Sequence, residues 1–217
     1  PYLRLCDAYD IVVKVSPCPC NRAKDDKDGV NSMMYLSKGL PVPAQDEIVR
    51  VSHSGKIFAL GPEMAGLWEA ARLAPKPVPP QKVRYIECLE KAGLVVTTKE
   101  EGWLALYQLF AGSIICPQTE MDGELQKAGS DGRVWCWIQC AGLRLSASEL
   151  VRLEEQGTEP TPELLGEEGR QALTEKIYSA ETIQDGVLEY EMEHSQARDG
   201  LVAVLLRLLQ SGSLFLV

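Results

Sequence analysis

The stretch Tyr85–Leu104, YIECLEKAGLVVTTKEEGWL, is the part of the sequence that decides the expected fold. It begins with a predicted short helix, because Ile86 and Leu89 fall near helical spacing and give one apolar face. Gly93 is the expected end of this helix, since glycine enters the left-handed backbone conformation without a Cβ penalty. The stretch therefore starts as an amphipathic helix that stops at a glycine.

The residues after this glycine predict a β-hairpin. Leu94–Val96 is a predicted strand, Lys99–Gly102 a charged turn and Trp103–Leu106 a returning strand. We therefore expect helix, glycine, strand, turn and strand in this order.

Composition and charge indicate a globular chain whose partner is a protein. The 217 residues are 45% hydrophobic and 24% charged, which suits one large domain or two small ones. The formal net charge is −9, and residues 116–217 carry 8 basic and 18 acidic side chains. Such a negative field repels a phosphate backbone. A protein or peptide, and a basic one in particular, is therefore favoured over nucleic acid, although an ordinary solvated acidic surface is the simpler interpretation of the acidic run.

A cytoplasmic location with no membrane partner is expected. No basic region followed by an apolar run opens the sequence, and no segment approaches 18 uninterrupted apolar residues. The seven cysteines are odd in number and scattered through apolar segments, which fits reduced thiols better than a disulfide framework.

Residues 1–45 are expected to form an N-terminal strand and a long, mobile loop. The strand is the apolar run Ile11–Val15, with a second short strand before it. The loop is rich in Pro, Asp, Lys, Asn and Gly, and only Met33–Leu36 offers it a buried anchor.

Residues 46–117 are expected to form the first folded unit. Glu47–Leu60 predicts a hairpin with a glycine near its turn, and Pro62 lies in the first turn of the helix that follows. The proline-rich segment Ala74–Pro80 separates this helix from a second one at Gln81–Ala92. The inner stripe of the first helix is predicted to be Met64, Leu67, Trp68 and Ala71.

A polar linker at residues 118–133 is expected to lead to a second unit at residues 134–217. Trp135–Cys140 is the predicted first strand of this unit. Acidic helical segments at Thr161–Ser179 and Thr182–His194 make the unit longer than the first. The side chains that these segments offer to a core are Leu173, Ile177, Ile183, Val187 and Leu188.

Two patterns of the first unit recur in the second. Leu60–Leu67, a strand end that passes into a helix, is matched by Leu145–Leu153. There, Ser146 or Ser148 would cap the second helix.

The helix, glycine and strand of Leu89–Val96 are likewise matched by Leu208–Val217, with Gly212 in the place of the first glycine. The second copy includes the apolar run Leu214–Val217, which must be buried. Its own sheet or a partner would cover this run, and self-association into a homo-oligomer is one way to do so.

No catalytic residue, cofactor or metal ligand is predicted. Cys18 with Cys20 and Cys136 with Cys140 are two close pairs that could supply four thiolates to zinc, but their spacings differ from those of zinc knuckles. We interpret them as reduced thiols, with a metal site as the alternative.

The two histidines also lack a catalytic setting. Neither His53 nor His194 is accompanied by a nucleophile with a base and an orienting group, and no glycine pattern cradles a phosphate. A non-enzymatic function is therefore expected.

DNA binding is the alternative function. Lys82, Arg84 and Lys91 belong to the second helix of the first unit, and Lys99 to the tip of the predicted hairpin, where they could contact phosphates. Interleaved acidic residues leave little net attraction. These are Glu87, Glu90, Glu100 and Glu101.

The sequence GKIFALGPEMAGLWEAA at residues 55–71, followed by YIECLEKAGLVV at residues 85–96, resembles the winged-helix (helix-turn-helix) superfamily. The strands before the first helix resemble the PqqD-like peptide-recognition variant, in which a peptide adds to the sheet edge. The repeated pattern is similar to chaperones of ESX-type secretion. Together these resemblances imply an α+β fold of two tandem winged-helix-like units, each with short strands and about three helices.

The expected function is therefore that of a protein- or peptide-binding adaptor or chaperone-like module. An exposed strand edge in the predicted hairpin and the acidic surface of the second unit would be the contact regions. The candidate edge residues are Ile48, Val49, Val51, Ile57 and Phe58.

Overall fold

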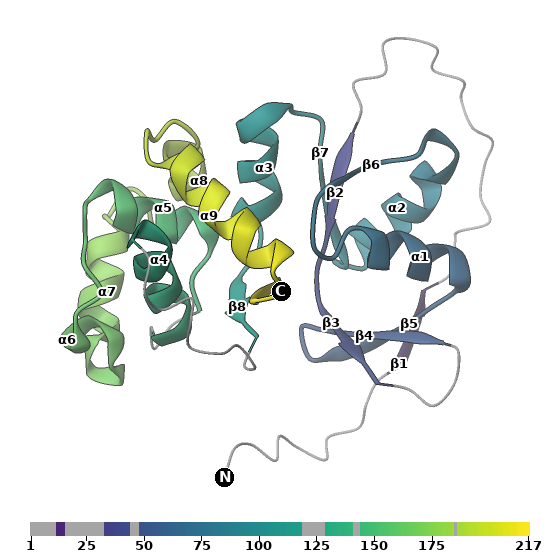
Figure 1. Ribbon diagram of the computed structural model, residues 1–217, viewed down its shortest axis with the longest axis horizontal. Helices are drawn as coiled ribbons and strands as arrows, with labels where there is room; N and C mark the ends of the chain where they lie inside the picture. The colour runs from purple at the N-terminus through teal and green to yellow at the C-terminus, as the bar shows by residue number, and fades with distance from the viewer. Residues whose placement is uncertain (1–11, 16–32, 44–47, 119–128, 141–143, 185) are drawn as a thin grey trace.

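A computed structural model of the protein describes residues 12–15, 33–43, 48–118, 129–140, 144–184 and 186–217. Its mixture of helices and strands confirms the α+β class. Figure 1 shows the elements of residues 12–98 gathered on one side of the molecule and the helices after residue 129 on the other.

The four-stranded sheet contains β1 (Val12–Val15), β3 (Leu40–Val42), β4 (Val49–His53) and β5 (Lys56–Leu60) in the order β1-β5-β4-β3. Strands β4 and β5 form the predicted hairpin, and Ser54 (φ 49°) and Gly55 (φ 73°) make its two-residue turn. Strand β1 lies parallel to β5, and β3 lies antiparallel to β4. Strand β3 thus lies where the sequence predicts a loop.

Helices α1 (Pro62–Ala70) and α2 (Val83–Lys91) cover the first core, which consists of buried apolar side chains of residues 35–95. The 3₁₀ turn η1 (Pro80–Lys82) leads into α2. All four residues of the predicted inner stripe are buried. Helix α2 ends at Gly93 (φ +75°), where the N–H of Gly93 donates to Glu90 and that of Leu94 to Leu89. These two bonds make a Schellman motif, so the predicted glycine stop is confirmed.

A second, three-stranded sheet consists of β6 (Lys76–Pro77), β2 (Met34–Ser37) and β7 (Val95–Thr98), in the order β6-β2-β7. The predicted hairpin after Gly93 is wrong in its second half, because Trp103–Leu106 belongs to helix α3 (Gly102–Ala111). Strand β7 pairs with β2, which comes from the predicted loop. The run WLALYQLFA is rich in the helix formers Leu and Ala and is long enough for a helix that buries Tyr107, Leu109 and Phe110.

Helix α4 (Gly129–Cys140) replaces the predicted strand at Trp135–Cys140 and begins inside the predicted linker. In this helix the apolar residues Val134, Trp135, Trp137 and Ile138 are all buried in one core. A short apolar run of this kind fits a buried helix as well as a strand. The other helices of this half are α5 (Ala147–Glu155), α6 (Pro162–Leu165), α7 (Arg170–Ile177), α8 (Val187–Glu193) and α9 (Arg198–Gln210), with the 3₁₀ turn η3 (Glu167–Gly169) between α6 and α7.

The second core consists of Leu36 and buried apolar side chains of residues 107–216. Ser146 is the cap of α5, in a capping box with Glu149. Among the residues predicted for this core, Leu173, Ile177 and Leu188 are buried and Val187 is half-buried. Ile183 is 70% exposed, so its prediction is wrong. It lies in the turn between α7 and α8, where no helix directs its side chain inward.

The helix–glycine–strand pattern does recur. Helix α9 ends at Gly212 (φ +72°) in a second Schellman motif. The N–H of Gly212 donates to the Leu209 oxygen, and the N–H of Ser213 donates to the Leu208 oxygen. Strand β9 (Leu214–Leu216) then pairs with β8 (Ile115–Pro117), and Leu214 and Leu216 are buried. Two residues of the apolar run are thus buried, whereas Phe215 and Val217 are half-buried.

The two halves meet at Leu36–Gly39. The Gly39 N–H donates to the Leu216 oxygen over 2.7 Å, and the Lys38 N–H donates to the Leu94 oxygen over 2.8 Å. The Lys38 ammonium donates to the Gly112 oxygen at the end of α3 over 3.1 Å. Strand β9 and the end of α3 are therefore hydrogen-bonded to Gly39 and Lys38, and the Thr98 hydroxyl of β7 also donates to the Gln108 side chain of α3 over 2.7 Å.

Candidate interaction site

A hollow of about 410 Å³ lies where β7 passes into α3. Gly102, the first residue of α3, has φ +62°, a left-handed conformation that favours glycine and turns the chain from strand to helix. The hollow is lined by Met34, Pro75, Glu100, Glu101, Gly102, Trp103, Ala105, Leu106 and Leu109. We call it the Trp103 hollow.

Trp103 is the exposed tryptophan of the described chain. Its side chain is 45% exposed, whereas Trp68, Trp135 and Trp137 are buried. The apolar lining comes from two elements far apart in the chain, since Met34 belongs to β2 and Leu106 to α3. A large exposed aromatic beside apolar side chains is typical of a protein-binding site.

The charged side chains that line the hollow are Glu100 and Glu101, both exposed. We call these two carboxylates the rim of the hollow. The preceding residue, Lys99, is exposed but does not line the hollow. The predicted hairpin tip is therefore a strand-to-helix turn with an acidic rim. The sequence predicts a strand at Trp103, so Trp103 is not among the predicted site residues.

The predicted strand-edge site is wrong. Ile48, Val49, Val51, Ile57 and Phe58 belong to, or directly precede, the hairpin β4–β5. Both hairpin strands are interior, because β3 pairs with β4 and β1 pairs with β5. Val51 and Phe58 are buried in the first core, and Ile48 is exposed just before β4. Strand β1 coincides with the strand predicted at Ile11–Val15, and β3 lies in the predicted loop. The sequence did not reveal that these two strands pair with the two edges of the hairpin.

The residues predicted to contact DNA do not form one basic surface with the tip of a hairpin. The Lys82 ammonium forms an ion pair with Glu63 and lies 5.3 Å from the centre of the Tyr85 ring. Arg84 and Lys91 are exposed on α2, whereas Lys99 lies in the turn before α3 rather than on a hairpin tip.

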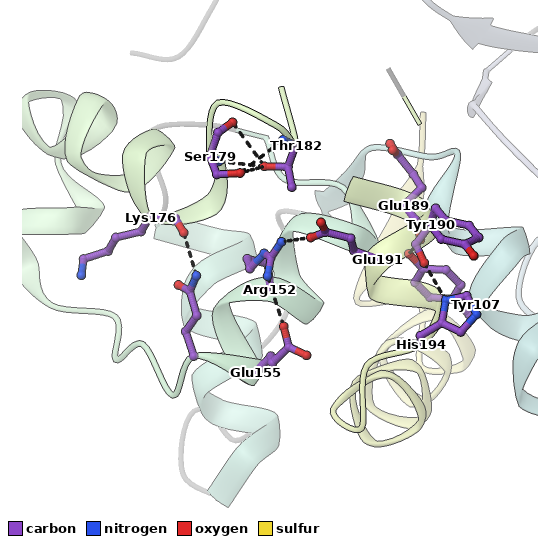
Figure 2. Close-up of polar contacts among 11 residues, drawn as sticks. Tyr107, Arg152, Glu155, Lys176, Ser179, Thr182, Glu189, Tyr190, Glu191 and His194 are labelled. Atoms are coloured by element: carbon purple, nitrogen blue, oxygen red, sulfur yellow. Dashed lines mark hydrogen bonds and ion pairs between the residues drawn. The ribbon is translucent and has the colours of Figure 1, made fainter. Parts of the chain in front are cut away.

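A polar network connects α3, α5 and α8 in the second half (Figure 2). The Tyr107 hydroxyl donates to the backbone oxygen of Glu189 over 2.8 Å and lies 2.9 Å from the Ser148 hydroxyl. Burial raises the pKa of Tyr107 to about 12, although the bond with Ser148 opposes this shift. This hydroxyl is therefore a neutral structural donor at physiological pH.

Figure 2 also shows Arg152 between Glu155 and Glu191. It borders a polar hollow of about 380 Å³ between α5, α7 and α8. Its guanidinium is already neutralised by two carboxylates, and Nδ1 of His194 lies 2.9 Å from the backbone oxygen of Tyr190. The ion pair of Arg152 with Glu191 joins α5 to α8, and none of these contacts activates a nucleophile.

The thiols are described only in part. Cys88, Cys116 and Cys136 form no disulfide within the described part of the chain, and Cys136 lies on helix α4. Cys18, Cys20 and the side chain of Cys140 lie outside the described part of the chain. Among the described residues, no group of three His, Cys, Asp or Glu side chains could hold a metal ion.

No described helix has the length and apolar character needed to cross a membrane. Comparison with known proteins returns no matching family model, no matching curated protein and no matching solved structure.

Proposed function

We propose that this chain is a non-enzymatic protein- or peptide-binding module, of the adaptor or chaperone-like kind, that holds its partner in the Trp103 hollow. The observation that carries the proposal is the exposure of Trp103 beside apolar side chains of β2 and α3. Aromatic residues that anchor a partner in a concave apolar site supply much of the binding energy at protein interfaces.

We further propose that the two halves are winged-helix-like units. The support is the same helix–glycine–strand junction at Gly93 and at Gly212. A cytoplasmic location belongs to the same proposal, and the reduced thiols of Cys88 and Cys116 fit a reducing compartment.

A random 12-residue peptide library displayed on phage tests the binding function. We expect selected peptides that bind the wild-type protein and lose about thirtyfold in affinity for Trp103→Ala, as for the loss of an aromatic anchor. Tyr190→Ala is the matched control, because Tyr190 is an exposed aromatic residue outside the hollow, at 67% exposure. Peptides that bind all three proteins equally would reject the Trp103 hollow as the binding site.

DNA binding through α2 is the alternative proposal, supported by the exposed Arg84 and Lys91. The ion pair of Lys82 with Glu63 counts against it, because a paired ammonium offers less charge to a phosphate. Retention on mixed duplex DNA at about 50 mM salt, lost in Lys82→Glu/Arg84→Glu, would favour this alternative. No retention is expected if the chain binds proteins.

A further inference from the structure

The Trp103 hollow combines three chemical features within a few residues. Its inner surface is apolar, with Met34, Leu106 and Leu109. An exposed indole ring forms part of its wall, and two exposed carboxylates, Glu100 and Glu101, belong to its rim. No basic side chain is among the lining residues that the structure describes.

These features fit one kind of side chain. Lysine and arginine carry an aliphatic stem that covers apolar surface while the charged head stays near water. A cation is attracted to the face of an indole ring, and carboxylates form charge-assisted hydrogen bonds with it. The hollow offers all three contacts, from Leu106, Trp103 and Glu100 respectively.

The alternatives fit less well. An acidic segment would be repelled by Glu100 and Glu101, since their charges are not paired with a basic lining residue. A purely apolar segment would cover these carboxylates without replacing their contacts with water, which costs free energy.

We propose that the Trp103 hollow recognises a lysine or arginine side chain of a partner peptide, flanked by an apolar residue that packs on Met34 and Leu106. This specificity rests on the proposed binding function and assigns a chemical class to its partner. Glu100 and Glu101 select the basic side chain, and Trp103 holds it.

The test uses the peptides from the display selection that bind in a Trp103-dependent way. We expect these peptides to be enriched in Lys and Arg next to an apolar residue. Glu100→Gln/Glu101→Gln should weaken their binding about tenfold in low salt, with a smaller loss at high salt because exposed charges are screened. Replacing the basic residue of the peptide by Gln should have the same effect on the wild-type protein and little effect on the double variant.

Glu69→Gln/Glu87→Gln is the matched control. Both residues are exposed in the first half and lie outside the hollow, so this variant removes the same charge from another surface. It should bind the peptides as the wild type does, and far-UV circular dichroism should show that both double variants are folded.

The outcomes separate the two proposals. Trp103-dependent peptides that lack basic residues, or that bind the Glu100→Gln/Glu101→Gln variant unchanged, would overturn the basic specificity and leave the binding function in place. A selection that gives no Trp103-dependent peptide would overturn both.

Discussion

The first and second cores each lie beside a helix–glycine–strand junction of the same kind, at Gly93 and at Gly212, but the surroundings of the two junctions differ. Gly93 lies against His53, so that a Cβ added at Gly93 would lie 3.3 Å from the His53 Nε2 atom, whereas nothing lies within 4 Å of a Cβ at Gly212. Trp68 in the first core donates to the Lys38 oxygen over 2.8 Å. Trp137 in the second core has no partner for its indole N–H among the described residues. A repeated local motif therefore does not bring a repeated environment.

The largest expected effect separates Trp68 from Trp137. Trp68→Phe should lower the free energy of unfolding by about 2–4 kcal/mol, because it loses packing and leaves the Lys38 carbonyl without its donor. Trp137→Phe loses similar volume but also removes an unpaired buried N–H, so we expect about 1–2 kcal/mol. Urea unfolding followed by far-UV circular dichroism measures both. A cost for Trp137→Phe equal to that for Trp68→Phe would show that the hydrogen bond does not distinguish the cores.

The next effect separates the two glycines. Gly212→Ala should cost about 1 kcal/mol, since alanine must adopt a left-handed conformation there. Gly93→Ala should cost about 1–3 kcal/mol, because the His53 ring must also move. Chemical denaturation of each variant gives the two values.

A double-mutant cycle sharpens this comparison. If the His53 contact is the cause of the difference, His53→Ala should reduce the cost of Gly93→Ala to that of Gly212→Ala. A cost that stays unchanged in the His53→Ala background would assign the difference to the backbone alone.

The smallest effect concerns pH. Burial, and then the nearby Lys38 ammonium, lower the pKa of His53. The unfolded chain, with a histidine pKa of about 6.5, therefore binds this proton more readily than the folded protein. Stability linked to His53 is present above this pH and is lost as the pH falls through it.

We expect the wild type to lose more stability between pH 7.5 and pH 5.5 than His53→Gln does, as measured by urea unfolding at both values. His194→Gln, which removes the exposed histidine of the second half, serves as the control. A loss in His53→Gln as large as in the wild type would reject the role of His53.

The candidate site shows where sequence reasoning stopped. The helix α2, its glycine stop and the hairpin β4–β5 follow from local patterns and are confirmed. The local pattern predicts a strand at Trp103, because four apolar residues after a charged turn fit a returning strand as well as the start of a helix. Only the continuation of this run to Ala111 indicates a helix, and the sequence alone does not say whether β7 has another partner.

The sequence by itself determined the elements whose stability is local. The left-handed turns at Gly93 and Gly212, the capping box at Ser146 and the proline at the start of α1 depend on residues a few positions apart. The tertiary structure decided what depends on residues far apart in the chain. It pairs β2 with β7, covers both sides of the hairpin β4–β5, and turns Trp103–Leu106 and Trp135–Cys140 into helices. Apolar segments bury their side chains equally well in either conformation, so the choice depends on the partner surface that the rest of the fold supplies.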